Sequence, residues 1–135
     1  MQKISFNDFK QIMLYDVIKN NACIEIEFCV EGSKEYTSCW LGKTAAAETS
    51  NETYWFGLTS DGLQAYDFDI LEDFVNTGVF KGRSLKEIWN FVCIYSIDGC
   101  DIKERVPFYL GLEDGPIRGP AKYTNNDFND DKKEK

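Results

Sequence analysis

The residues in this chain most able to do chemistry are its carboxylates. Five of them fall within thirteen residues, at Asp61, Asp67, Asp69, Glu72 and Asp73. A glycoside hydrolase needs a pair of carboxyl groups held at a defined separation. Here Asp69 and Glu72 have the spacing of a helix capping box, and Asp73 follows on the exposed side of the same predicted helix. The spacing therefore favours local structural roles over catalysis.

The absence of histidine narrows the chemistry further. Ser-His-Asp and Cys-His nucleophilic sites, His-ligated zinc and the most common general base near neutral pH all require that side chain. We expect no catalytic residue and no enzymatic activity. A carboxylate-based hydrolase is the least favoured alternative.

Metal and cofactor sites are not indicated either. Oxygen ligands gather at 67–72, but this region lacks the alternating acidic positions, central Gly and twelfth-position Glu of an EF-hand loop. The helix entry at 81–84 lacks the several glycines of the phosphate-binding fingerprints. The sequence therefore predicts no metal and no cofactor.

The cysteines favour a reducing compartment. The five, Cys23, Cys29, Cys39, Cys93 and Cys100, form no CxxC pair, and their odd number leaves one thiol unpaired in any monomeric scheme. Cys29 and Cys39 fall on adjacent predicted strands, where a disulfide is geometrically conceivable, but reduced thiols are favoured. With no apolar stretch of the roughly 18 residues that span a bilayer, we expect a cytoplasmic chain without a membrane partner.

The elements that must position these residues are those of one α+β domain. A chain of 135 residues, 43% hydrophobic, suffices for one core. We expect an N-terminal helix packed on a mostly antiparallel meander of about five strands, with two short helices before the last strand. The domain is placed at 1–106, and an irregular C-terminal tail, collecting Gly and Pro, at 107–135.

Apolar spacing and turn residues give the element bounds. Helices are predicted at 6–20, from Asp69 to a left-handed Gly78, and at 85–90 after the capping box of Ser84 and Glu87. Strand alternation places Glu25 and Glu27 on the solvent-exposed face of the first strand. The strands are predicted at 23–30, 36–41, 54–59, 63–68 and 91–97. A mobile loop or a single helical turn is predicted at 42–52, and the last strand is expected to be buried on both faces near the centre of the sheet.

The distribution of charge is the feature of the sequence that points to a function. The net charge of −8 excludes a general binder of nucleic acid or anionic membranes, because both need Lys and Arg to neutralise phosphates. Residues 44–80 contain no Lys or Arg and seven acidic residues. This concentration predicts a negative lobe that attracts a basic protein.

Strand alternation suggests how that lobe would bind. If Tyr54, Phe56 and Leu58 face the core, Trp55 faces outward, and an exposed Trp among acids is typical of a binding hot spot. The predicted partner-binding residues are Trp55, Asp61, Tyr66, Asp67, Asp69, Glu72 and Asp73.

The leading hypothesis is a small, acidic, non-enzymatic interaction module that binds a basic protein surface. By analogy with other small acidic proteins that occupy a basic cleft, an inhibitor or immunity-like role fits. The alternative from another class is a small-ligand or carbohydrate-binding domain, with a concave pocket containing Trp40, Trp55 or Trp89. The sequence leaves the oligomeric state and the identity of the partner open.

Overall fold

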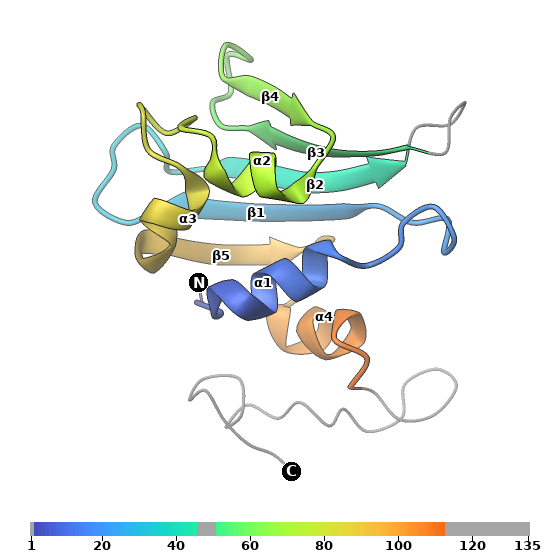
Figure 1. Ribbon diagram of the computed structural model, residues 1–135. Helices are drawn as coiled ribbons and strands as arrows, with labels where there is room; N and C mark the ends of the chain where they lie inside the picture. The colour runs from blue at the N-terminus through green and yellow to red at the C-terminus, as the bar shows by residue number, and fades with distance from the viewer. Residues whose placement is uncertain (1, 46–50, 113–135) are drawn as a thin grey trace.

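The computed structural model describes residues 2–45 and 51–112 and shows the predicted α+β architecture (Figure 1). It consists of an N-terminal helix, a five-stranded antiparallel sheet and several short helices. The elements are α1 (Phe6–Met13), β1 (Ile24–Val30), β2 (Cys39–Ala45), β3 (Glu52–Gly57), β4 (Ala65–Phe68), α2 (Leu71–Asn76), α3 (Leu85–Ile88), the 3-10 turn η1 (Trp89–Phe91), β5 (Val92–Ile97) and α4 (Ile102–Tyr109).

The sheet has the strand order β4-β3-β2-β1-β5, so the first four strands form the expected meander. The prediction that the last strand lies near the centre is wrong, because β5 pairs with β1 at one edge. Its apolar run is buried except at Tyr95, which is 43% exposed, so the predicted burial on both faces is wrong at that residue. Gln2 pairs with Ile94 on the outer side of β5, and α4 packs along the same edge (Figure 1). These two neighbours supply the burial that the sequence pattern suggested.

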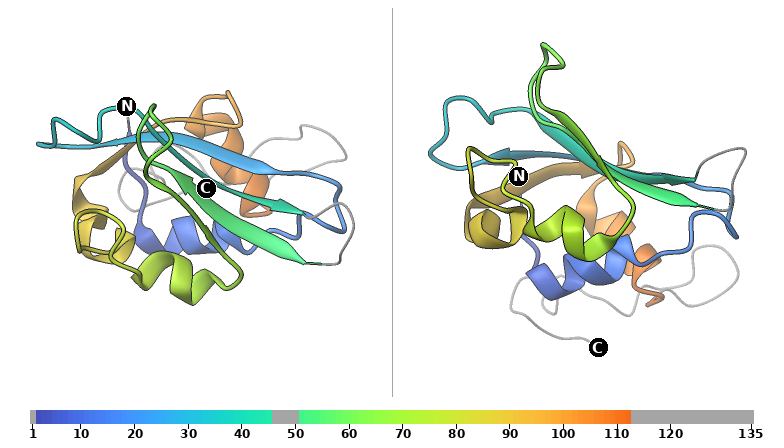
Figure 2. Two further views of the ribbon diagram at one scale, coloured as in Figure 1. Left: turned by 90° about the horizontal axis from the view of Figure 1, so that it is seen from above. Right: turned by 45° about the horizontal axis from the view of Figure 1, so that its top comes forward.

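One face of the sheet carries the core. Helices α1, α2 and α3 lie on this face, and no helix in the described part of the chain lies on the opposite face (Figure 2). Alternation directs Ile24, Ile26 and Phe28 of β1 toward the helices. Tyr54, Phe56 and Leu58 are buried as predicted, which places Trp55 on the other face.

The helices depart from the predicted bounds in two places. Helix α1 ends at Met13, well before residue 20, because the carbonyls of Met13 and Tyr15 accept hydrogen bonds from the Lys43 side chain. Helix α2 begins at Leu71 with Ile70 at its N-cap, and no side chain caps it. The predicted capping role of Asp69 is therefore wrong. The helix ends at Asn76 with an extended Thr77, so Gly78 is not its left-handed residue.

The capping box of α3 is confirmed. The Ser84 hydroxyl accepts from the Glu87 backbone N–H, and the Glu87 carboxylate accepts from the Ser84 N–H. The helical turns continue through η1 to Phe91, close to the predicted end at residue 90.

The second strand is displaced along the sequence. It spans Cys39–Ala45, so residues 42–45 belong to β2 and the predicted loop at 42–52 is wrong at both ends. Residues 46–50 lie outside the described residues. Lys43 explains the difference. The polar composition of this stretch is typical of a loop, but the long Lys43 side chain is buried at a position within a strand.

The chain continues in regular structure beyond the predicted domain boundary. Helix α4 spans Ile102–Tyr109 and contains Pro107, so the boundary at 106–107 falls inside it. The Asp98 carboxylate binds the Arg105 guanidinium at 2.8 Å and accepts a short hydrogen bond from the Tyr109 hydroxyl. Burial and the Asp98 charge raise the pKa of Tyr109, which therefore keeps its proton as the donor. Residues 113–135 lie outside the described residues.

Candidate interaction surface

The sheet face without a helix presents two rows of side chains. In one row Glu25, Gly42, Trp55 and Asp67 stand directly opposite one another on β1, β2, β3 and β4. In the next row Glu27, Trp40 and Gly57 do the same on β1, β2 and β3. We call these seven residues the open face.

Each indole of the open face has a glycine across from it. Trp55 lies over Gly42, where an added Cβ would come 2.6 Å from Cζ2 of the indole. Gly57, opposite Trp40, has no heavy atom within 4 Å of the position a Cβ would take, apart from its chain neighbours. A hollow results beside Gly57, lined by Glu25, Trp40, Trp55, Gly57 and Thr59.

The charge of the open face has one sign. Glu25 and Asp67 are exposed, and the partly exposed Glu27 carboxylate accepts from the Ser38 hydroxyl at 3.2 Å. Among the residues of the five strands, Lys43 is the only Lys or Arg, and it points to the helix-covered face. No strand therefore supplies a cation to this surface.

The predicted binding residues are only partly brought together. Trp55 and Asp67 form a direct cross-strand pair on the open face. Tyr66 lies on the other side of the sheet, opposite Phe56, where it is half-buried against the core. Alternation along β4 causes this separation, since neighbouring residues of a strand point to opposite faces.

The other predicted acids lie elsewhere. Asp61 belongs to the turn between β3 and β4, where it accepts from the Thr59 hydroxyl and the Leu63 N–H. These hydrogen bonds, with that of Thr59 first, lower the pKa of Asp61. Glu72 and Asp73 are exposed on α2, which covers the opposite face of the sheet (Figure 2). The acidic segment is thus divided between two faces and a turn.

Asp69 lines a second hollow, at the end of the sheet nearest the C-terminus of α1. Its other lining residues are Leu14, Asp16, Ile18, Asn51 and Glu52. Two of the acids here, Asp16 and Glu52, are engaged in structural contacts. Asp16 accepts from the Lys19 N–H, and Glu52 pairs with Lys43 at 3.2 Å.

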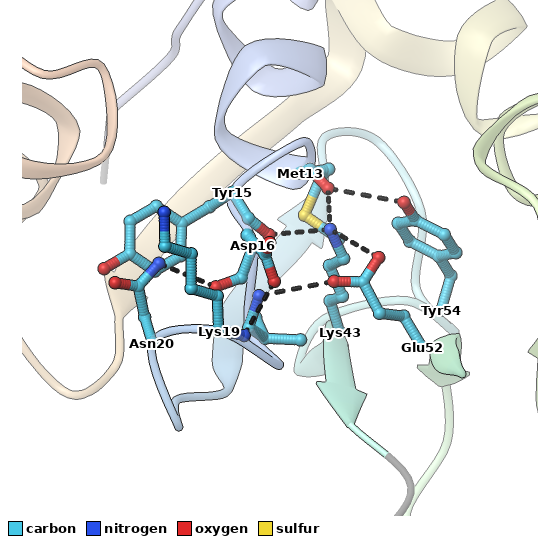
Figure 3. Close-up of polar contacts among 9 residues, drawn as sticks. Met13, Tyr15, Asp16, Lys19, Asn20, Lys43, Glu52 and Tyr54 are labelled. Carbon is cyan, nitrogen blue, oxygen red and sulfur yellow. Dashed lines mark hydrogen bonds and ion pairs between the residues drawn. The ribbon is translucent and has the colours of Figure 1, made fainter. Parts of the chain in front are cut away.

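Figure 3 shows the network behind this second hollow. Lys43 is 1% exposed, and its Nζ donates to the carbonyls of Met13 at 2.8 Å and Tyr15 at 2.7 Å. Glu52 also accepts from the Val17 N–H at 3.3 Å. The ammonium group therefore replaces the missing helical N–H donors at the end of α1 and ties that end to β2 and β3.

Within residues 2–45 and 51–112, no three His, Cys, Asp or Glu side chains are arranged to hold a metal ion. All five cysteines are free thiols. Cys39 pairs with Phe28 and so shares its helix-covered face, whereas Cys29, the next residue, lies on the opposite face. That arrangement explains why the conceivable Cys29–Cys39 disulfide does not form.

Comparison with models of protein families, with curated proteins and with solved structures found no match. No helix of the described residues is long and apolar enough to cross a membrane.

Sequence reasoning missed Trp40, Glu25 and Glu27 as members of the charged aromatic surface. The alternation of β1 already put both glutamates on the wet side of the strand. A run of acidic residues marks only a continuous segment of the chain, however, while a sheet surface is assembled from several strands. The register of β2 against β1 and β3 is what joins them.

Proposed function

We propose that this domain is a non-enzymatic interaction module that binds a basic protein surface through the open face. The observation that carries the proposal is the pair of cross-strand rows, in which two indoles stand among three carboxylates and no strand contributes a cation. Aromatic area provides affinity when desolvated, and charge of one sign accelerates encounter with an opposite charge.

The arrangement of the open face supports this function better than the acidic segment as a whole. Trp40 is 38% exposed, whereas Trp89 is buried and donates its Nε1–H to the Ile4 carbonyl at 2.8 Å. Trp55 is half-buried, and its Nε1 is buried without a hydrogen-bond partner, but its side chain lines the hollow beside Gly57. Trp40 and Trp55 are thus the indoles that a partner could reach. Both residues lie on strands that are paired on each side, so the backbone around them is ordered before a partner binds, which lowers the entropic cost of association.

The test is a pull-down with the full-length chain as bait at low and high salt, with bound proteins identified by mass. A basic protein that binds at low salt and dissociates at high salt is the expected result, because salt screens exposed charges. The double variant Glu25→Lys/Asp67→Lys should lose this protein. The matched control Glu72→Lys/Asp73→Lys makes the same charge change on α2 and should retain it.

The same pair of variants can contradict the proposal. Retention by Glu25→Lys/Asp67→Lys together with loss by Glu72→Lys/Asp73→Lys would move the interface to α2. Capture of neutral or acidic proteins without any salt dependence would exclude the electrostatic mechanism.

A second function is favoured by the hollow beside Gly57. Trp40 and Trp55 both line it, as the carbohydrate-binding alternative requires, and Trp89 does not take part. Indole rings pack against the apolar faces of sugars, while the Glu25 carboxylate and the Thr59 hydroxyl, whose proton is donated to Asp61, offer hydrogen-bond acceptors to sugar hydroxyls. Titration of indole fluorescence with a panel of neutral sugars tests this function. Saturable changes that Trp40→Ala removes would support it.

A further inference from the structure

We propose that the hollow between Trp40 and Trp55 receives an arginine side chain of the basic partner. This inference rests on the proposed function, since it names the group by which the partner is recognised. Arginine combines a flat guanidinium, which stacks on aromatic rings, with a permanent charge that pairs with carboxylates.

The shape of the hollow comes from the glycine opposite Trp40. Since a Cβ at Gly57 would have empty space around it, the backbone of β3 forms an open floor between the side chains of Trp55 and Thr59. Trp40 stands directly across on β2 and Trp55 stands two residues before Gly57 on β3. Side chains at such diagonal positions lie about 7–8 Å apart, within reach of one long side chain placed between them.

The charges around the hollow fix the sign of its occupant. Glu25 lines the hollow itself, and Glu27 and Asp67 flank the two indoles in the cross-strand rows. An anion would be repelled by all three carboxylates. A cation that enters can pair with Glu25 while it contacts an indole ring.

The aromatic lining favours arginine over lysine. A guanidinium is planar and weakly hydrated, so it can stack on an indole and still donate two parallel hydrogen bonds to a carboxylate. A lysine ammonium is compact and strongly hydrated, and it loses more on leaving water. If charge alone determined binding, arginine and lysine would bind with equal affinity. The ratio of the two affinities therefore reports whether the indole rings take part.

The experiment compares two fluorescein-labelled peptides by anisotropy, with the full-length chain as titrant. One contains three arginines separated by glycines, and the other has lysine at the same positions. The arginine peptide should bind at least about threefold more tightly, the size expected of an exposed cation–π contact. Gly57→Val should weaken its binding by about tenfold, since the branched side chain fills the hollow without backbone strain.

Ala65→Val is the matched control, because Ala65 lies opposite Gly57 on β4 and does not line the hollow. It should leave the affinity within about twofold of the parent value, as expected of a surface change. Equal affinities for the two peptides, or equal effects of the two Val variants, would overturn the arginine site.

The outcomes separate this inference from the proposed function. If a basic protein is captured and Glu25→Lys/Asp67→Lys abolishes capture, yet the two peptides bind equally, the interaction module stands and the arginine site falls. If no basic protein is captured and neither peptide binds, both fall. Saturable binding of a neutral sugar that Gly57→Val and Trp40→Ala abolish, while neither variant weakens binding of the arginine peptide, would overturn the arginine site in favour of the second function.

Discussion

Trp55 lies across Gly42 of the neighbouring strand, so that its indole occupies the space that a side chain at residue 42 would fill. A Cβ at Gly42 would overlap the carbonyl oxygen of Ile24 and come 2.8 Å from Cε2 of the indole. The glycine therefore determines the position of Trp55 and, through it, one wall of the hollow beside Gly57.

Gly42→Ala should destabilise the domain by about 1–3 kcal/mol, the usual cost of overpacking a site whose neighbours are backbone and an aromatic ring. The measurement is urea unfolding followed by far-UV circular dichroism. Gly57→Ala is the control, because its Cβ meets nothing, and it should leave stability unchanged or raise it by up to about 1 kcal/mol. Equal midpoints for the two variants would contradict the close approach at Gly42.

Lys43→Met should cost about 3 kcal/mol, because it leaves two backbone carbonyls at the end of α1 without their donor and breaks a largely buried ion pair. This value is at the low end for such pairs, since the Glu52 side chain is 25% exposed. Lys86→Met, at an exposed position of α3, should change stability by less than about 0.5 kcal/mol. A Lys43→Met protein as stable as Lys86→Met would show that the network contributes no stability.

The sequence predicted the layers of the fold because their signals are local. The Ser84–Glu87 capping box sets its own helix entry within four residues, and the alternation around Trp55 sets which side chains are buried. The prediction from local sequence was wrong around Lys43. A lysine in a run of small polar residues suggests a loop, and only the distant carbonyls of Met13 and Tyr15 make its burial favourable.

The candidate site shows the same division between local and distant determinants. The Trp55 and Asp67 pair could be predicted from one hairpin. Glu25 and Trp40 join it only through the register of β1, β2 and β3, which no short stretch of sequence specifies. Glu72 and Asp73 are close to Asp67 in sequence, but the chain turns into α2 on the other side of the sheet.

Stability should fall with acid. Hydrogen bonds lower the native pKa values of Glu31, through Lys3, of Glu35, through Lys81, and of Glu87, through Ser84. Unfolded glutamates titrate at their ordinary value of about 4.5, so these contributions are complete above that pH and are lost as pH falls through the lower native values. Urea midpoints measured from pH 6 to pH 3 should therefore decline below about pH 4.5.

Glu35 allows this pH dependence to be assigned. Its carboxylate bonds the Lys81 ammonium at 2.7 Å, and accepts from Gln64 as well. Both Glu35→Gln and Lys81→Met should make the acid decline shallower, because each removes the bond that lowers the pKa. A constant midpoint from pH 6 to pH 3 in the parent protein would refute the acid decline, and a decline as steep in both variants as in the parent would refute its assignment to Glu35.

Thiol reactivity should separate the cysteines by their surroundings. Cys23 is exposed and should react first with a thiol reagent at pH 8, even though its partial burial and the nearby Glu25 and Asp98 raise its pKa. Burial raises the pKa of Cys39 to about 12, and its thiol donates to the Leu58 carbonyl at 3.3 Å, so it should react last.

Cys23→Ser should remove the fast phase and Cys39→Ser should leave it intact, while all five thiols react in urea. Rapid modification of Cys39 in the folded protein would mean that β2 opens readily and that the open face, which shares this strand, is not a rigid surface.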